Sequence, residues 1–162
     1  MQLSFHVIDD AIHKANIETG YWIDVDSGEI SKTENIRPYK AAKYIQSEDS
    51  SFGVYQVPVL YRYPGGMNRR IRWEDSNQTD MTADIYKEIV SKAEASLGEA
   101  VKKAKNELKN TLSDEACAML IPFDSIQFAV SDGHGVLKYG EERKIFLCPI
   151  AIVKEDCAIT LC

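Results

Sequence analysis

The pentapeptide SDGHG at positions 131–135 holds a carboxylate and an imidazole two residues apart. An imidazole can act as a general base and a carboxylate can orient it, provided that a nucleophile or a bound water lies within hydrogen-bond distance. Asp-Gly is also a strong hairpin signal, because glycine accepts a positive φ without steric cost. The pattern favours a hairpin turn. The alternative is a small hydrolase site, or a pocket for a small ligand or nucleotide, formed by Asp132 and His134 with Tyr139 or Cys148.

Acidic, histidine and cysteine residues elsewhere do not have the spacing of a metal site. The segment WIDVDSGEI places Asp24, Asp26 and Glu29 around a turn, but an EF-hand loop needs a further ligand before its glycine and a glutamate at its end. The three histidines and four cysteines contain neither C-x-x-C nor H-x-x-x-H, the spacings typical of zinc ligands. We therefore expect no metal ion and no other cofactor, with Cys117 and Cys148 packed in the core.

A hairpin rich in arginine and aromatic residues is the strongest candidate for a binding surface. It turns at Pro64-Gly65-Gly66 and lacks the glycine-rich patterns that cradle phosphate before a helix. Arginine beside aromatic rings is enriched at protein interfaces and can also stack on bases or bind phosphate. The alternative is structural, with one face packed and solvated arginines on the other that discourage edge aggregation. The candidate contact residues are Tyr61, Arg62, Tyr63, Arg69, Arg70, Arg72 and Trp73.

The elements that would position these residues are mainly strands. QLSFHVI predicts a first strand, and GYWIDV and GEIS predict a hairpin around Asp26-Ser27-Gly28. FGVYQVPVLYRYPGGMNRRIRWED predicts a second hairpin, in which Pro58 places the first strand at an edge or a bulge. Between these segments, DDAIHKANI predicts a helical turn or two, and Pro38 opens a short helix. SIQFAVS, GVLKYG, RKIFLCPIAIV and CAITLC predict a C-terminal four-stranded antiparallel meander.

One long amphipathic helix is predicted from about Met81 to Leu112. Apolar residues recur there at steps of four and three, close to the helical period. Asp80 is the expected N-cap, and Asp84 adds favourable charge near the positive end of the helix dipole. A short helical piece, SDEACAMLI, is expected to follow. The apolar stripe comprises Tyr86, Val90, Ala93, Leu97, Val101, Ala104, Leu108 and Leu112.

These elements together predict a single α+β domain over residues 1–162. Its antiparallel sheet, made of the hairpins and the C-terminal meander, is packed by the long helix in two layers. A chain of 162 residues has the length of one domain with one core. The apolar stripe could also bury against a second copy, so self-association through the helix is a further expectation.

Charge and hydropathy restrict the partners and the compartment. The formal net charge of −6 argues against general nucleic-acid binding, because neutralising phosphates requires a surplus of Lys and Arg. The N-terminus lacks the basic start and apolar core of a signal peptide, and the longest apolar run, 145–153, is too short to span a bilayer. We expect a cytoplasmic protein that makes no membrane contact and keeps its thiols free.

The sequence favours a function without catalysis. Nucleophile elbows, metalloprotease helices and paired carboxylates at readable spacing are absent from it. We interpret the protein as a macromolecule-binding inhibitor, adaptor or accessory subunit, whose partner is a protein rather than a nucleic acid. A narrower hypothesis, resting on charge alone, is a phage or other mobile-element protein that blocks a host nucleic-acid-handling machine with its acidic surface.

Overall fold

The computed structural model describes residues 1–41, 43–44, 51, 53–111, 113 and 116–121, and it describes the backbone alone of 126–131, 134–139 and 143–146. Antiparallel sheets and two α-helices make up this part of the chain, which confirms the α+β class. None of the helices in these ranges has the length and apolar character needed to cross a membrane.

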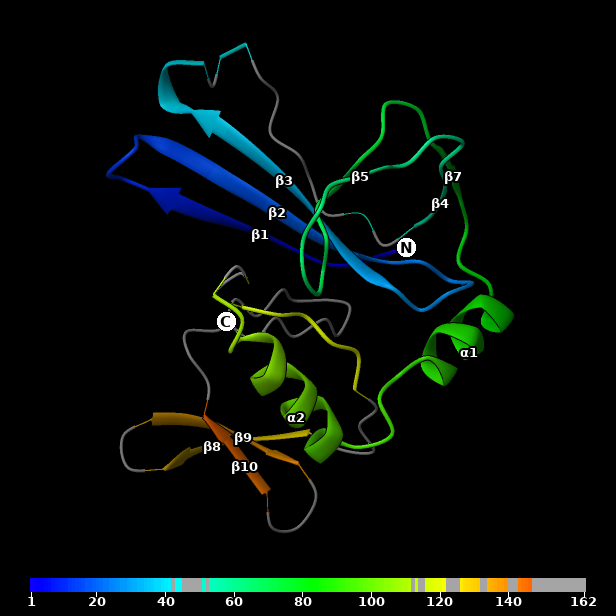
Figure 1. The fold of residues 1–162 in the computed structure, drawn as a ribbon, viewed down its shortest axis with the longest axis vertical. Helices are drawn as coiled ribbons and strands as arrows, with labels where there is room; N and C mark the ends of the chain where they lie inside the picture. Colours follow the sequence, from blue (N-terminus) through cyan, green and yellow to red (C-terminus); the bar gives the residue numbers. More distant parts are fainter. Residues whose placement is uncertain are drawn as a thin grey trace.

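The largest sheet has three antiparallel strands in the order of the sequence. They are β1 (Gln2–Asp10), β2 (Ala15–Ile23) and β3 (Ile30–Pro38), and they form the long twisted ribbon in the upper part of Figure 1. The first predicted strand and the predicted hairpin between GYWIDV and GEIS are both confirmed. In the turn of that hairpin Gly28 has a φ of +76°, a conformation that glycine adopts without steric cost.

The segment DDAIHKANI forms a turn between strands, so the prediction of helix there is wrong. Its first residues end β1, its last residues begin β2, and residues 11–14 connect them. The Asp10 carboxylate accepts a hydrogen bond from the backbone N–H of His13 (3.0 Å), and Lys14 has a φ of +53°. A side chain that bonds the backbone locally stabilises a turn in preference to a helix.

The core of the main sheet is partly polar. Glu18 in β2 is 0% exposed, and its carboxylate accepts hydrogen bonds from Arg37 Nε (2.9 Å) and Asn35 Nδ2 (3.3 Å) of the neighbouring strand β3. Glutamate is rarely fully buried unless a cation compensates it. The pair Glu18–Arg37 therefore links β2 to β3 inside the protein.

His6 on β1 is also partly buried, and its Nδ1 has no hydrogen-bond partner among the described residues. The ring stacks on Tyr21 with a centroid distance of 6.1 Å. Burial disfavours the imidazolium and lowers the pKa of His6 below its usual value of 6.5. As the pH falls through 6.5, His6 is therefore protonated in the unfolded chain before it is protonated in the folded protein. The stability contributed by neutral His6 is thus present above that pH and is lost below it.

Removing this imidazole should flatten the pH dependence of stability. In both His6→Phe and His6→Gln, we expect Tm to fall less between about pH 7 and pH 5 than it does in the wild type, because neither side chain titrates there. Only the phenylalanine variant should also gain stability at neutral pH, since it removes an unpaired buried nitrogen. Thermal melts across this pH range measure both effects, and parallel curves for wild type and both variants would refute the assignment.

Two small strand pairs follow the short 3₁₀ helix η1 (Tyr39–Ala41), which begins one residue after Pro38. β5 (Tyr61–Arg62) pairs with β6 (Ile71–Arg72), so the predicted hairpin through Pro64-Gly65-Gly66 is confirmed. β4 (Val54–Gln56) pairs with β7 (Asn77–Thr79) outside it. Pro58 lies between β4 and β5, where no ladder hydrogen bond is required of it.

Two helices replace the single long helix that the periodicity predicted, so that prediction is wrong. α1 (Ala83–Ser91) begins after Thr82, not Asp80, and the Thr82 hydroxyl accepts a hydrogen bond from Ile85 N (3.3 Å). α2 (Leu97–Glu107) begins after Ser96, whose hydroxyl accepts from Glu99 N (3.2 Å). Ser96 is extended, with φ −155° and ψ 155°, and an N-cap in that conformation interrupts a helix.

The predicted apolar stripe is consequently divided. Ile89, Leu97 and Ala100 are the buried helical residues, and only Leu97 belongs to the stripe. The two-layer packing and the self-association were both predicted for the long helix, which the described structure replaces with two helices, and the single predicted sheet is divided into separate sheets. The stripe residues that are exposed in the structure are Tyr86, Val90, Val101 and Leu108.

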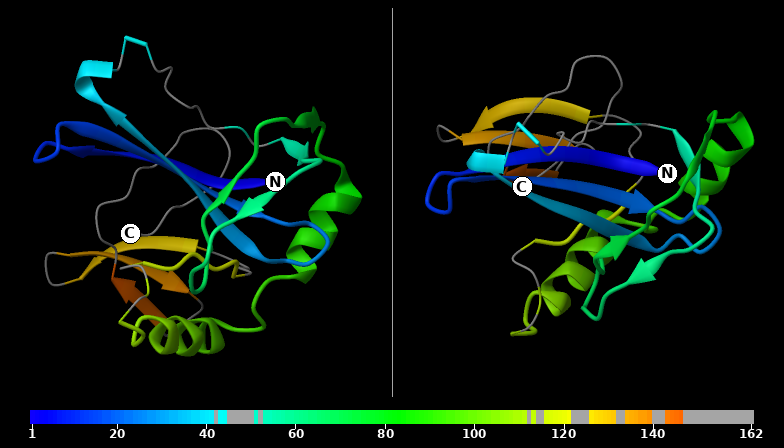
Figure 2. Two further views of the ribbon diagram at one scale, coloured as in Figure 1. Left: turned by 45° about the horizontal axis from the view of Figure 1, so that its top comes forward. Right: turned by 90° about the horizontal axis from the view of Figure 1, so that it is seen from above.

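A separate antiparallel sheet follows the helices. β8 (Ile126–Ser131), β9 (His134–Tyr139) and β10 (Arg143–Phe146) lie in the order β10-β9-β8, at the end of the molecule opposite η1 (Figures 1 and 2). They are three of the four predicted meander strands, and the fourth, at 157–162, lies outside the described residues. Residues 116–121, in the predicted helix SDEACAMLI, are not helical.

Candidate functional site

The β5–β6 hairpin is joined to the edge of the main sheet. Lys32 N of β3 donates to Arg69 O (3.0 Å), and Lys32 and Arg70 form a parallel bridge. Beyond the two paired residues of each strand, Tyr63 N donates to Arg70 O (2.9 Å) and lengthens the hairpin. The hairpin is thus fixed by backbone hydrogen bonds to β3.

The register of the hairpin divides the predicted site residues between two faces. Tyr61 pairs with Arg72, and Arg62 pairs with Ile71. Because side chains alternate along each strand and directly opposite residues share a face, Arg62, Ile71 and Trp73 lie on one face. We define the Tyr/Arg face as the four residues on the other side: Tyr61, Tyr63, Arg70 and Arg72.

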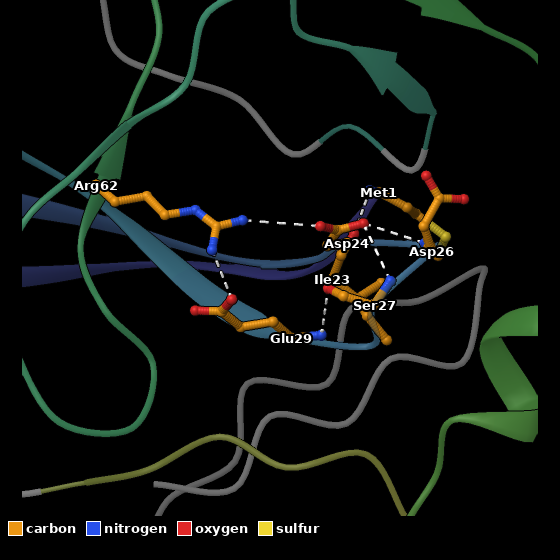
Figure 3. A network of polar contacts seen from close by, with 7 residues as sticks. All are labelled: Met1, Ile23, Asp24, Asp26, Ser27, Glu29 and Arg62. Atoms are coloured by element: carbon orange, nitrogen blue, oxygen red, sulfur yellow. Dashed lines mark hydrogen bonds and ion pairs between the residues drawn. The ribbon is translucent and has the colours of Figure 1, made fainter.

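On the first of these faces, Arg62 holds the hairpin against the β2–β3 turn (Figure 3). Its Nη1 lies 2.7 Å from Glu29 Oε2, and its Nη2 lies 3.8 Å from Asp24 Oδ2. Asp24 Oδ1 also accepts hydrogen bonds from the backbone N–H groups of Asp26 (3.1 Å) and Ser27 (3.4 Å). Partial burial works to raise the pKa of Asp24, but the bonds from Ser27 and Asp26 and the charge of Arg62 outweigh it, so the pKa is lowered.

The carboxylates of this turn therefore serve the fold. Figure 3 shows Asp24 and Glu29 pointing toward Arg62, and beside them the terminal amine of Met1 donates to Ile23 O (2.8 Å). Within the described part of the chain, no group of three or more His, Cys, Asp or Glu residues is arranged to hold a metal ion.

Trp73 packs against the main sheet. Its ring meets Trp22 edge-on at 4.8 Å between centroids, and Trp22 meets Tyr55 edge-on at 5.3 Å. The indole N–H of Trp22 donates to Thr33 Oγ1 (3.0 Å). Edge-to-face aromatic pairs add stability beyond the area that they bury. Trp73 and Arg62 thus attach the hairpin to the main sheet and to the β2–β3 turn.

The Tyr/Arg face is open to solvent. Tyr61 is 50% exposed and Tyr63 is 41% exposed. The Arg70 guanidinium lies 5.4 Å from the centre of the Tyr63 ring and donates to Glu34 O (3.1 Å). The Arg72 side chain is 62% exposed and pairs with Glu74 at 3.2 Å, an exposed contact that contributes little to stability. Exposed Val59, two residues before Tyr61, lines a shallow pocket together with Tyr61.

Asn68 anchors the loop at 64–70, a role that the sequence analysis did not predict. Asn68 is 5% exposed and has a φ of +57°. Its Nδ2 donates to Ile30 O (3.1 Å) and to Ala118 O (3.0 Å), and its Oδ1 accepts from Ala118 N (2.6 Å). The Asn68 side chain therefore forms hydrogen bonds with backbone groups of two segments that are distant from it in the sequence. Asparagine tolerates this left-handed conformation, which is the only signal that the sequence offered.

Of the alternative pocket, the structure describes only the backbones of His134 and Tyr139, so the pocket stays a prediction. His134 begins β9 and Tyr139 ends it, so their backbones are about 16 Å apart at the rise of an extended strand. Ser131 pairs with His134, which agrees with the predicted hairpin at this position. Asp132 and Cys148 lie outside the described residues. Elsewhere, partial burial raises the pKa of the half-buried Cys117 thiol.

Comparison with known proteins found no matching family model, no matching curated protein and no matching solved structure. The chemistry of the Tyr/Arg face is therefore the basis on which a function is assigned.

Proposed function

We propose that this protein acts by binding another protein through the Tyr/Arg face, as an inhibitor, adaptor or accessory subunit. The observation that carries the proposal is the strand alternation, which turns two tyrosines and two arginines of one hairpin outward. Tyrosine and arginine are enriched among the residues that dominate binding energy at protein interfaces. Val59 adds an apolar side chain beside Tyr61.

Charge indicates the kind of partner surface. Residues 61–73 contain four arginines and no acidic residue, although the chain as a whole has a net charge of −6. A local positive field on an acidic protein attracts a partner surface that presents carboxylates and repels one that is basic. We therefore propose a protein partner whose contact surface is acidic.

The hairpin is also held in a binding-competent shape before any partner arrives. Arg62 ties it to the β2–β3 turn, and Lys32 ties it to β3. On the face itself, Arg70 is oriented by Glu34 O and by the Tyr63 ring. Side chains that are already ordered lose less conformational entropy on binding, which favours affinity.

Removing the outer ends of the face should weaken partner binding without unfolding the protein. We expect Tyr61→Ala combined with Arg72→Ala to reduce the amount of captured partner at least about 30-fold, since two tyrosine or arginine interface residues cost about 1–2 kcal/mol each. Tm should stay within about 2 °C of wild type, because both side chains are exposed. Quantitative mass spectrometry of protein captured from lysate provides the first readout, and calorimetry the second.

A matched control lies elsewhere on the chain. Lys43 sits over the ring of the exposed Tyr44 at 5.6 Å, so Lys43→Ala with Tyr44→Ala removes a similar exposed pair of cation and aromatic ring. This control should capture as much partner as the wild type. Equal retention by the face variant and the control would remove the Tyr/Arg face from consideration as the contact surface.

The narrower hypothesis of a mobile-element protein that blocks a host machine is a separate candidate, because it uses the acidic surface of the chain and not the Tyr/Arg face. It predicts that the captured partner is itself a nucleic-acid-binding protein, met by the acidic surface of this chain. Direct nucleic-acid binding by the Tyr/Arg face is the second candidate, because arginine and tyrosine also stack on bases. It predicts retained nucleic acid in the same capture and a steep dependence on salt.

A further inference from the structure

A polar groove of about 250 Å³ lies between β3 and the hairpin loop, lined by Lys32, Glu34 and the loop residues 64–70. We propose that this groove is a binding site for a phosphate group. The inference goes beyond the proposed protein contact, because the groove and the Tyr/Arg face share only Arg70.

More cationic than anionic side chains line the groove. Lys32, Arg69 and Arg70 contribute three cations and Glu34 one carboxylate, and a second carboxylate, Glu107, is bonded to Met67 N of the loop. The Lys32 ammonium lies 3.5 Å from Glu34 Oε2, and its side chain is only 15% exposed, so the sheet fixes this charge in place. Cations gathered at one concave, partly desolvated place focus the field and raise the local concentration of anions.

Arg69 is the cation most available to a ligand. It is exposed, and it forms no hydrogen bond or ion pair through its side chain with any residue that the structure describes. The guanidinium carries donors in a fork that matches two oxygens of a phosphate. Arg69 can therefore turn toward an anion without breaking an existing contact.

The floor of the groove is rigid. Asn68 is hydrogen-bonded to Ile30 and Ala118, and Glu107 Oε1 of α2 accepts from Met67 N (2.8 Å). Glu107 approaches so closely that a Cβ added at Gly66 would lie 1.8 Å from its Oε1. The loop is thus held from β3, from α2 and from the segment around Ala118, which keeps the shape of the groove before a ligand binds.

The size and lining of the groove favour a small anion. Pockets for drug-sized ligands have volumes of about 300–1,000 Å³ and are mostly apolar, whereas this groove is smaller and its lining includes four charged side chains. The glycine-rich phosphate loops that precede helices are absent, so the side chains of Lys32, Arg69 and Arg70 would supply most of the contacts.

The test is a titration of the ¹⁵N-labelled full chain with inorganic phosphate, followed by the amide resonances of Gly65, Gly66 and Arg69. We expect saturable shifts at these residues that sodium chloride at equal ionic strength does not produce. Arg69→Ala should weaken the affinity about tenfold by removing one charge-assisted contact. Arg72→Ala is the matched control, because it removes an exposed arginine of the same hairpin outside the groove, and it should leave the affinity unchanged.

Two further titrations identify the source of the phosphate. Tighter binding of phosphoserine than of inorganic phosphate would indicate a phosphorylated amino acid, and tighter binding of a nucleoside monophosphate would indicate a nucleotide. Shifts that chloride reproduces, or an affinity that Arg69→Ala leaves unchanged, would overturn the proposal. Because protein binding is tested with Tyr61 and Arg72 and phosphate binding with Arg69, the failure of one proposal is distinguishable from the failure of the other.

Discussion

Replacing Arg37 with alanine is expected to lower the free energy of unfolding by about 3 kcal/mol, because it takes a guanidinium away from a carboxylate that cannot reach water. Glu18 is 0% exposed, and Arg37 Nε lies 2.9 Å from its Oε1. The cost of the variant is mainly that of a buried carboxylate that has lost its arginine. Urea denaturation at neutral pH measures this loss of stability as a lower transition midpoint, with the slope of the transition unchanged.

The double variant Glu18→Gln with Arg37→Met separates this cost from the value of the pair. Both charges are removed and the side-chain volumes are nearly kept, so we expect a loss well below that of Arg37→Ala. If the double variant is as unstable as Arg37→Ala, the lost hydrogen bond and ion pair between Glu18 and Arg37, and not a buried charge left behind, account for the effect.

Replacing Asn68 with alanine should be about as damaging, with an expected loss of about 3 kcal/mol. The backbone groups of Ile30 and Ala118 would lose their side-chain partners in a buried place. Alanine would also have to adopt the left-handed φ of +57° observed at this position, which costs about 1–2 kcal/mol for a residue with a Cβ.

Two further variants divide these contributions. Asn68→Gly removes the hydrogen bonds but tolerates the positive φ, so it should be less destabilised than Asn68→Ala by about 1 kcal/mol. Asn68→Asp keeps an oxygen that accepts from Ala118 N and loses the two donated bonds. Hydrogen exchange at the Ala118 amide should accelerate in the alanine and glycine variants only, and normal protection there would contradict the anchoring role of Asn68.

The strands of this fold were largely predictable, because their signals are local. Asp26-Ser27-Gly28 and Pro64-Gly65-Gly66 mark turns through residue types that fit special backbone conformations, and both turns are present as expected. Strand-like runs joined by short polar connections likewise predicted β8 to β10. The α+β class followed from these strands together with the amphipathic helical segment.

The helix prediction was wrong because periodicity alone does not reveal an interruption. Ala93 and Leu97 keep the four-residue spacing across the break between α1 and α2, so the apolar pattern continues while the backbone does not. Ser96 and Glu99 have the spacing of a capping box, the sequence signature of a helix start. That local signal outweighed the period, and it was readable in the sequence.

The site was predictable in composition but not in arrangement. The excess of arginine and aromatic residues identified the hairpin, yet only the register assigns Arg62 and Trp73 to the anchoring face. Arg62 binds Glu29 across 33 positions of the chain, and Asn68 binds Ala118 across 50. No local pattern contains such partners, because they depend on how the strands are placed in space.

The most direct test of the central claim is capture from native cell lysate with the tagged wild-type chain at two salt concentrations. Mass spectrometry and nucleic-acid staining then identify what is retained. The proposal predicts a protein retained in stoichiometric amount, less of it at the higher salt because charge contributes to the contact, and its loss with Tyr61→Ala/Arg72→Ala. Retention of nucleic acid without a protein, or of the same protein by the face variant, would contradict it.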